Sequence, residues 1–350
     1  MQIEQTPLLD YNDVLIRPKR SEARSRKDVS LSRTFTFKHT GVSWSGVPIV
    51  ASNMSTIGTL EMAKALSPLD CCVCLHKFYP YEELIEQLQT LPPDLSIVSL
   101  GTSDEDFLKF HQLHENLIIL RGLGIRFACI DVANGYTTHF CDRVKIFREK
   151  YPEVALMAGN VCTPEMVQEL ILSGVDVCKV GIGNGSHCLT RKITGVGYPQ
   201  LSAVIECADA AHGLGGLICA DGGCNTPADI CKAFGAGADF VMIGGMFAGH
   251  EEAGGEIVQT PDGPKKECFG MSSQRAMESF HGGKDWYRAS EGKQVLHDQK
   301  GSVVDTVLTI LGGLRSACTY VGANSLKDLS KCTTFVRVNR THNTYFGDDG

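Results

Sequence analysis

The chain has 350 residues, of which 43% are hydrophobic and 21% charged, and its formal net charge is −7. This balance is typical of a globular protein with a large core, and the acidic charge argues against a non-specific nucleic-acid binder. No run approaches the roughly 20 apolar residues needed to cross a bilayer, so we expect no membrane span. The polar start MQIEQTPLLDYND lacks the basic flank and apolar core of a signal peptide, which predicts a cytoplasmic protein.

Cysteine is frequent, with 15 residues, many of them in apolar runs where a free thiol behaves as a small hydrophobic group. An odd number without a secretory signal indicates a reducing compartment. Cys71 and Cys74 form a CxxC pair within CCVCLHK, which is interpreted either as a metal or redox site or as a buried strand. No second CxxC or paired-histidine motif accompanies it, which favours the strand.

After an N-terminal extension over residues 1–46, eight short apolar runs alternate with helical patterns. Most runs are continuously apolar, as expected for strands covered on both faces. The eight runs are, in chain order, GVPIVASN, CCVCLHK, SIVSLGTS, FACIDVANG, VALMAGNV, VDVCKVGIG, GLICADGG and DFVMIGG. They predict an α/β fold, a single-domain (β/α)8 TIM barrel over residues 1–350. A doubly wound sheet is the alternative, but it would carry a phosphate fingerprint after its first strand, and none follows Asn53.

Two helices repeat the same start and stop signals. Thr163-Pro164 and Thr226-Pro227 each place a capping threonine before a proline at the first helical position. Each helix is predicted to end in glycine, and each then leads into a strand that itself ends in glycines. The repeat supports a series of similar strand–helix units.

Two regions are predicted to lie outside the barrel. The N-terminal arm contains the basic run RPKRSEARSRK, which is interpreted as a solvated arm or as a contact for an anion or a neighbouring subunit. Residues 249–300 are polar and glycine-rich and follow the eighth strand. A loop of this length in a compact domain is usually functional, which predicts a flap inserted after strand 8.

Barrels of this kind bind ligands at the carboxyl ends of their strands. Here Asp221-Gly222-Gly223 and Gly244-Gly245 follow the seventh and eighth strands, which is the usual phosphate position. Glycines allow backbone N–H groups to approach phosphate oxygens closely. We therefore predict a mononucleotide site in which Asp221 accepts hydrogen bonds from ribose, the alternative being an aspartate that only caps its loop.

The segment GIGNGSHCLTR follows the sixth strand, and its cysteine has three interpretations: part of a phosphate loop, a structural thiol or a nucleophile. No Gly-Lys-Ser/Thr follows, which excludes a P-loop. A polar, glycine-rich loop suits a reactive thiol better than a core residue, which favours Cys188 as a nucleophile. Carbonyl groups of Gly183, Gly185 and Cys188, next to Arg191, could also surround a monovalent cation such as K⁺.

These motifs, together with TGVGYPQLSAV, GMSS, YRASEG and GGLRSACTYVG, resemble the inosine-monophosphate dehydrogenase and guanosine-monophosphate reductase superfamily over residues 8–338. The chain is more similar to the reductase branch. It runs directly from CLHKFYP into the next helix, without the regulatory insertion usual in dehydrogenases. Its flap has the order Tyr287-Arg288, whereas the dehydrogenase flap carries an Arg-Tyr pair that activates water.

The resemblance implies reductive deamination of GMP to IMP and ammonia by NADPH, in a cytoplasmic homotetramer. Cys188 would attack C2 of the purine to give a thioimidate, and Thr190 and Glu291 would move the protons. The alternatives are an IMP dehydrogenase without the regulatory insertion and a non-catalytic nucleotide-binding relative.

The resemblance also implies binding residues for substrate, cofactor and cation. For GMP they are Ser186, Asp221, Gly222, Gly223, Gly244, Gly245, Gly270, Met271, Ser272, Arg288, Ala289, Ser290, Glu291 and Gly292. For NADPH they are Ser25, Arg26, Lys77, Asp131, Val132, Ala133, Ile182, Gly183, Met271, Tyr287, Arg288, Ser316, Ala317, Cys318 and Thr319, in part from a neighbouring subunit. For the cation they are Gly183, Gly185, Cys188 and Arg191.

Four positions depart from the reductase pattern. Asn184 replaces the usual proline, His187 a small β-branched residue, Leu189 a threonine, and Ser55 the aspartate of an NMDT motif. The glycines, Cys188 and the threonine after Leu189 are kept, so the chemistry should survive. His187 either tunes the neighbouring thiol or points elsewhere, and we expect the second.

Overall fold

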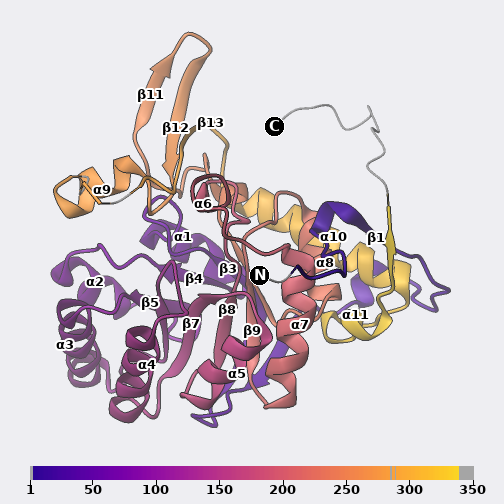
Figure 1. Cartoon of the computed structure of the whole chain (residues 1–350), viewed down its shortest axis with the longest axis horizontal. Coiled ribbons are helices and arrows are strands. Elements are labelled where there is room, and N and C mark those ends of the chain that lie inside the picture. The colour runs from indigo at the N-terminus through magenta and orange to yellow at the C-terminus, as the bar shows by residue number, and fades with distance from the viewer. Residues whose placement is uncertain (1–2, 284–285, 288, 339–350) are drawn as a thin grey trace.

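The computed structural model describes residues 3–283, 286–287 and 289–338. Eight parallel strands form a closed barrel, because the last of them, β10, pairs with the first, β3 (Figure 1). The strands are β3 (Ser43–Ala51), β4 (Cys71–Leu75), β5 (Ser96–Leu100), β6 (Phe127–Asp131), β7 (Ala155–Val161), β8 (Val177–Val180), β9 (Leu217–Asp221) and β10 (Phe240–Ile243). Seven of them lie within their predicted apolar runs, whereas β3 begins at Ser43, ahead of the run that starts at Gly46. The predicted (β/α)8 barrel is confirmed.

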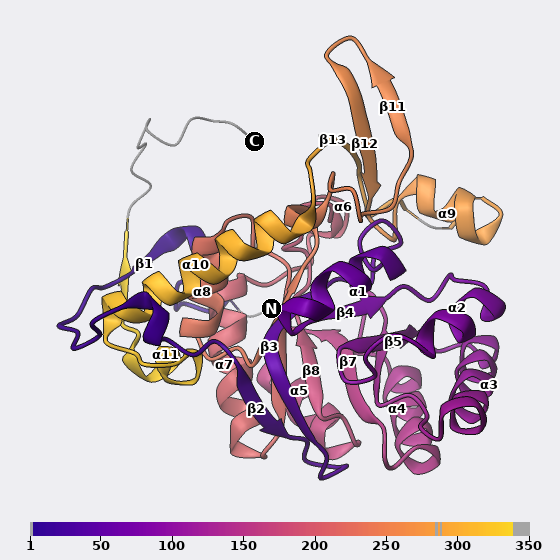
Figure 2. The same ribbon diagram turned by 180° about the vertical axis from the view of Figure 1, so that it is seen from behind.

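A helix follows each barrel strand and covers its outer side (Figures 1 and 2). These helices are α1 (Leu60–Leu66), α2 (Tyr81–Leu88), α3 (Asp104–Arg121), α4 (Thr138–Lys150), α5 (Pro164–Leu172), α7 (Gln200–Gly213), α8 (Pro227–Gly235) and α10 (Val303–Val321). Short helices extend this set: α6 (Thr190–Thr194), α11 (Leu326–Cys332) and the 3-10 turns Tyr11–Asp13, Arg26–Asp28, Ser67–Leu69 and Gly245–Phe247.

The two repeated helices begin as predicted. Pro164 and Pro227 are the first residues of α5 and α8, after extended cap residues Thr163 and Thr226. A glycine of positive φ lies two residues beyond each helix, Gly174 at 114° and Gly237 at 108°. This is the conformation in which glycine costs least, and it turns the chain toward the next strand.

The core has two layers, one inside the barrel and one between the barrel and its helices. β2 (Arg33–Thr36) pairs antiparallel with the start of β3, and this hairpin closes the amino-terminal end of the barrel. Phe35 and Trp44 from the hairpin pack on Phe240, whose ring centroid lies 5.1 and 4.9 Å from theirs. The barrel is therefore filled at this end, and only its opposite end is available for a ligand.

The cysteines confirm the interpretation of the CxxC pair as a strand. Cys71 and Cys74 lie on β4, where Cys71 packs in the outer layer and Cys74 in the barrel interior. Alternate faces of a strand keep these two thiols apart. All fifteen cysteines are free, and only Cys188 and Cys332 are not fully buried.

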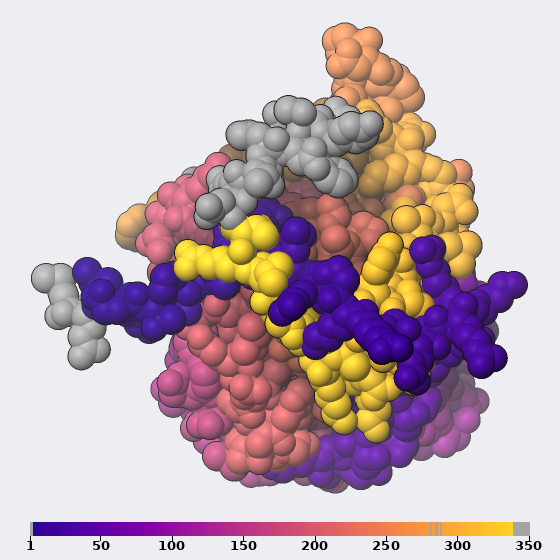
Figure 3. Space-filling view, turned by 90° about the vertical axis from the view of Figure 1, so that its right-hand side faces the viewer, coloured from indigo at the N-terminus to yellow at the C-terminus, as the bar shows by residue number. Residues whose placement is uncertain are grey.

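The N-terminal arm joins the end of the described chain. β1 (Val14–Ile16) pairs antiparallel with β14 (Phe335–Arg337), and the backbone N–H of Lys19 donates to the carbonyl of Tyr320 on α10 at 2.9 Å. Most of the basic run that follows β1 is exposed, as expected for a solvated arm. Figure 3 shows the arm and the C-terminal helices side by side on one face.

Residues 249–300, the flap region, contain more regular structure than the predicted loop. β11 (Ile257–Thr260), β12 (Gly263–Phe269) and β13 (Gln294–Asp298) form an antiparallel sheet, and α9 (Gln274–His281) lies between β12 and β13. The β11–β12 hairpin projects from the carboxyl end of the barrel (Figure 1). Within the described ranges, no helix is long and apolar enough to cross a membrane.

Candidate active site

A cavity of about 700 Å³ opens at the carboxyl end of the barrel, between the strand ends and the flap region. Its volume is in the range of small-molecule sites. Predicted residues that line it are Lys77, Asp131, Val132, Ala133, Ile182, Gly183, Gly185, Ser186, Cys188, Thr190, Asp221, Gly222, Gly223, Gly244, Gly245, Gly270, Met271, Ser272, Tyr287, Ala289, Glu291 and Gly292. The fold thus brings together most of the residues singled out from the sequence.

Cys188 lies in the loop between β8 and α6. The loop begins at Gly181, where a Cβ atom would lie 2.1 Å from the carbonyl oxygen of Asp221, so only glycine fits. The loop then turns back, and the N–H of Cys188 donates to the carbonyl of Gly185 at 3.0 Å. This turn presents the thiol to the cavity, in contrast to the buried cysteines of the barrel.

Cys188, Thr190 and Glu291 form a continuous hydrogen-bonded chain. The Sγ atom of Cys188 lies 3.2 Å from Oγ1 of Thr190, and that hydroxyl donates to Oε2 of Glu291 at 2.7 Å. The carboxylate comes from the flap region and the other two groups from the loop after β8. The arrangement places a potential nucleophile one hydroxyl away from a group that can accept or return a proton.

Backbone pairing holds Glu291 in this position. The N–H of Leu189 donates to the carbonyl of Glu291 at 2.6 Å, and the N–H of Lys293 donates to the carbonyl of His187 at 2.9 Å. On the other side, the N–H of Glu291 donates to the carbonyl of Ser272 at 3.1 Å. The segment around Glu291 is therefore held by backbone hydrogen bonds between the Cys188 loop and the residues just before α9, where Gly292 bridges to Cys188 and to Ser273.

Glycines provide a close backbone surface beside the loop that carries Cys188. Gly222 and Gly223 have φ of 89° and 80°, which other residues rarely adopt. A Cβ atom on Gly245 would lie 2.5 Å from Oγ of Ser186. Glycine backbone with an adjacent hydroxyl is a suitable cradle for a phosphate group.

A buried lysine anchors the acidic side of the cavity. Nζ of Lys179 forms ion pairs with Asp131 and with Asp221, the latter at 3.2 Å, and donates to Oδ1 of Asn53 at 3.2 Å. Burial alone would lower the pKa of Lys179, but the two carboxylates outweigh it and raise that pKa well above its usual value. Burial would raise the pKa of Asp131, and Lys179 reverses this to a net decrease.

Sequence reasoning missed Lys179, which lies inside the sixth apolar run. A lysine inside an otherwise apolar strand was a usable signal, because lysine is almost never fully buried unless it is paired. Asn160, near the end of β7, also belongs to this part of the site. Its side-chain amide donates to Oδ2 of Asp221 at 2.8 Å and to the carbonyl of Gly181 at 2.7 Å, which links the two loops.

Some predicted residues do not face this cavity. Among the described residues these are Ser25, Arg26, Arg191, Ser290, Ser316, Ala317, Cys318 and Thr319. Ser290 accepts from the N–H of Gln274 and donates to the carbonyl of Gly292, both at 3.1 Å, so its hydroxyl is used within the flap region. Cys318 is fully buried, which excludes its side chain as a ligand contact in this chain. Arg288 lies outside the described residues.

The departures from the reductase pattern have local partners. The side-chain amide of Asn184 donates to the carbonyl of Asp221 at 3.0 Å. His187 points away from the thiol and toward His297, as expected. Ser55 has a buried hydroxyl without a hydrogen-bond partner among the described residues, and its N–H lies 3.3 Å from Sδ of Met271.

Comparison with known proteins identifies the class. The IMP dehydrogenase / GMP reductase domain matches residues 8–344, so the chain belongs to this family. It is 56% identical over 349 residues to the GMP reductase of Salmonella typhi, with 99% of each chain covered. It is also 56% identical over 351 residues to the GMP reductase of Escherichia coli, a match that covers 99% of this chain and all of that one. It is 55% identical over 351 residues to the GMP reductase of Salmonella arizonae.

Proposed function

We propose that this chain is a GMP reductase, which catalyses GMP + NADPH + 2 H⁺ → IMP + NADP⁺ + NH₄⁺. The observation that carries the proposal is the hydrogen-bonded chain from Cys188 through Thr190 to Glu291 at the cavity. The names of relatives that match over nearly the whole chain support it.

The first half of the reaction removes the amino group. The Sγ atom of Cys188 forms a bond to C2 of the purine, and the C2–N bond breaks to leave a thioimidate. An amine leaves only when protonated, and Glu291 delivers the proton through the hydroxyl of Thr190. Backbone N–H groups of the Gly222-Gly223 and Gly244-Gly245 turns, with Ser186, would hold the phosphate, and Asp221 would accept hydrogen bonds from the ribose.

The second half replaces the sulfur with hydrogen, and NADPH, when bound, supplies the hydride. The residues present fit such a molecule. The cavity extends from the Cys188 loop to Lys77, Val132 and Ala133, and Ile182 and Tyr287 also line it. Lys77 brings a positive charge to this end, although it is paired with Asp106 at 2.9 Å.

Ser25, Arg26 and residues 316–319 would serve the cofactor in a different way. The 3-10 turn Arg26–Asp28 packs against α10, which carries residues 316–319, and neither lies on the cavity of this chain. We infer that this patch meets the NADPH of a neighbouring subunit in a homotetramer. Arg26 is exposed and could pair with a 2′-phosphate there.

A monovalent cation such as K⁺ suits the loop before Cys188. Carbonyl groups of Gly183, Gly185 and Cys188 would hold it. A Cβ atom on Gly183 would lie 2.6 Å from Cγ of Arg191, so these segments do lie together. Bound there, the cation would fix the loop that carries the nucleophile. The free cysteines are consistent with the reducing cytoplasm.

One assay separates the alternatives. When GMP is present, the enzyme should consume NADPH, which is measured as a fall in NADPH absorbance. It should release ammonia and IMP in equal amounts. An IMP dehydrogenase would instead reduce NAD⁺ with IMP, and a binding protein would do neither. Either of those results would refute the proposal.

A further inference from the structure

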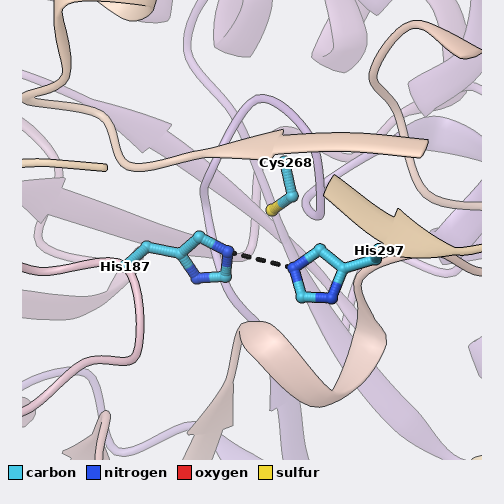
Figure 4. Close-up of side chains that lie close together, drawn as sticks. All are labelled: His187, Cys268 and His297. Carbon is cyan, nitrogen blue, oxygen red and sulfur yellow. Dashed lines mark hydrogen bonds between the residues drawn. The ribbon is translucent and has the colours of Figure 1, made fainter. Parts of the chain in front are cut away.

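One residue of the active-site loop and two of the flap region form a cluster that the proposed reaction does not use. His187, Cys268 and His297 place one imidazole nitrogen or sulfur atom each within 4.8 Å of the others (Figure 4). Among the described residues this is the group of histidine, cysteine and carboxylate side chains with the spacing of a metal site. We propose that it binds a transition-metal ion of the zinc type, with two imidazoles and one thiolate as ligands.

The separation of the two imidazole nitrogens suits tetrahedral coordination. Zinc lies about 2.0–2.1 Å from imidazole nitrogen, so two such nitrogens on a tetrahedral ion are about 3.3 Å apart. Nε2 of His187 lies 3.3 Å from Nε2 of His297. The sulfur of Cys268 points toward the gap between the rings (Figure 4). Three protein ligands leave a fourth position for water or another small ligand.

The fold positions all three side chains. His297 on β13 pairs with Lys266 on β12, two residues before Cys268, so both ligands project from the same face of the sheet. His187 reaches them from the loop after β8, where its carbonyl accepts from the N–H of Lys293 at 2.9 Å. A bound ion would therefore join the flap region to the residue that directly precedes Cys188.

The surroundings are those of a metal ligand set. His187 is 6% exposed and Cys268 1%. Nδ1 of His187 lies 3.1 Å from Oγ of Ser186, and Oγ1 of Thr56 lies 3.1 Å from the sulfur of Cys268. Such outer partners fix the orientation of ligands.

A metal titration tests the proposal in the Cys188→Ser variant, so that the active-site thiol cannot act as a ligand. Zn²⁺ is titrated against a chromophoric chelator, and Co²⁺ serves as a spectroscopic probe. We expect one ion per chain, a sulfur-to-cobalt charge-transfer band, and a rise in melting temperature that a chelator reverses. No nucleotide is present, so failure of the proposed GMP reductase activity would not change this result.

Removal of a ligand should abolish that binding. Loss of an outer partner usually weakens a metal site about 10–100-fold, so loss of a direct ligand should cost about 100-fold or more. We expect this for Cys268→Ser, with loss of the charge-transfer band, and for His297→Asn. The matched controls Cys332→Ser and His139→Asn should bind as the parent does. The proposal would be overturned if the Cys188→Ser parent bound no metal. It would also be overturned if Cys268→Ser bound metal with the affinity of the parent while circular dichroism showed it folded.

Discussion

Replacing Glu291 by glutamine would test the proton relay with little change in shape. Glutamine keeps a side-chain oxygen that can accept from Thr190 Oγ1, as Glu291 does at 2.7 Å. The backbone contacts of Glu291 with Leu189 and Ser272 do not involve the side chain and should remain. The variant therefore keeps the geometry and loses only the ability to deliver a proton.

Acid–base catalysis is typically worth 10²–10⁴-fold, so kcat for GMP should fall by about 100-fold or more. At about 1.36 kcal/mol per factor of ten, this is a barrier increase of roughly 2.7 kcal/mol or more. Hydride transfer needs no protonated amine. IMP with NADP⁺ should therefore still yield NADPH in a single-turnover burst, measured by absorbance in a stopped-flow instrument.

The matched control is Glu278→Gln. Glu278 is an exposed glutamate on α9 of the same flap region, and it accepts from Nε2 of Gln274 at 2.8 Å. This variant should keep the parent rate in both assays. The relay would be refuted by an unchanged kcat in Glu291→Gln, or by loss of the burst as complete as in Cys188→Ser.

Four further outcomes are expected. Cys188→Ser should abolish turnover while GMP affinity, measured by calorimetry, stays within about tenfold, because a nucleophile contributes to the barrier rather than to ground-state binding. NADPH should be used more efficiently than NADH, and Arg26→Ala should reduce that ratio of kcat/KM if Arg26 pairs with the 2′-phosphate as proposed. Lys179→Met should lower the free energy of unfolding by about 3 kcal/mol in denaturant titrations, because it removes the buried cation that pairs with the partly buried carboxylates of Asp131 and Asp221. The hydrogen bond from His212 to Asp239, at 2.8 Å, raises the pKa of His212, so its stabilisation is complete below the unfolded pKa of about 6.5 and is lost as the pH rises through the folded value. His212→Gln should accordingly lower the melting temperature at acidic pH and have little effect at alkaline pH.

The barrel could be predicted because its signals are local. Strands buried on both faces are continuously apolar, and α5 and α8 each begin at a proline after a threonine. The flap region has no such signal. β12 contains Gly263 and Pro264 at its start, and most of β11 and β13 is partly exposed. Pairing among these strands, rather than their own propensity, stabilises them, so the sequence predicted only a polar loop.

Part of the active site could likewise be predicted from local sequence signals, and part could not. The glycine pairs after β9 and β10 were found because strand ends converge at one end of a barrel. The contact between Thr190 and Glu291 spans 101 positions and depends on backbone pairing between two loops, which no local pattern encodes. Family resemblance alone predicted Glu291. The patch around Ser25 and Arg26 does not line this chain's own cavity, so its contact with the cofactor stays a prediction.

The departures from the reductase pattern bear on whether the chain is catalytic, and their contacts favour catalysis. Asn184 lacks the rigid ring of proline, but its amide hydrogen bond to the Asp221 carbonyl ties the loop to the end of β9. Leu189 replaces a threonine, but the group that the site uses at this position is its backbone N–H, which holds Glu291. His187 turns its ring toward His297 and leaves the thiol of Cys188 facing Thr190. An inactive relative would not need to keep the hydrogen-bonded chain from Cys188 through Thr190 to Glu291. Here the substituted positions lie around that chain, and all three of its members are kept.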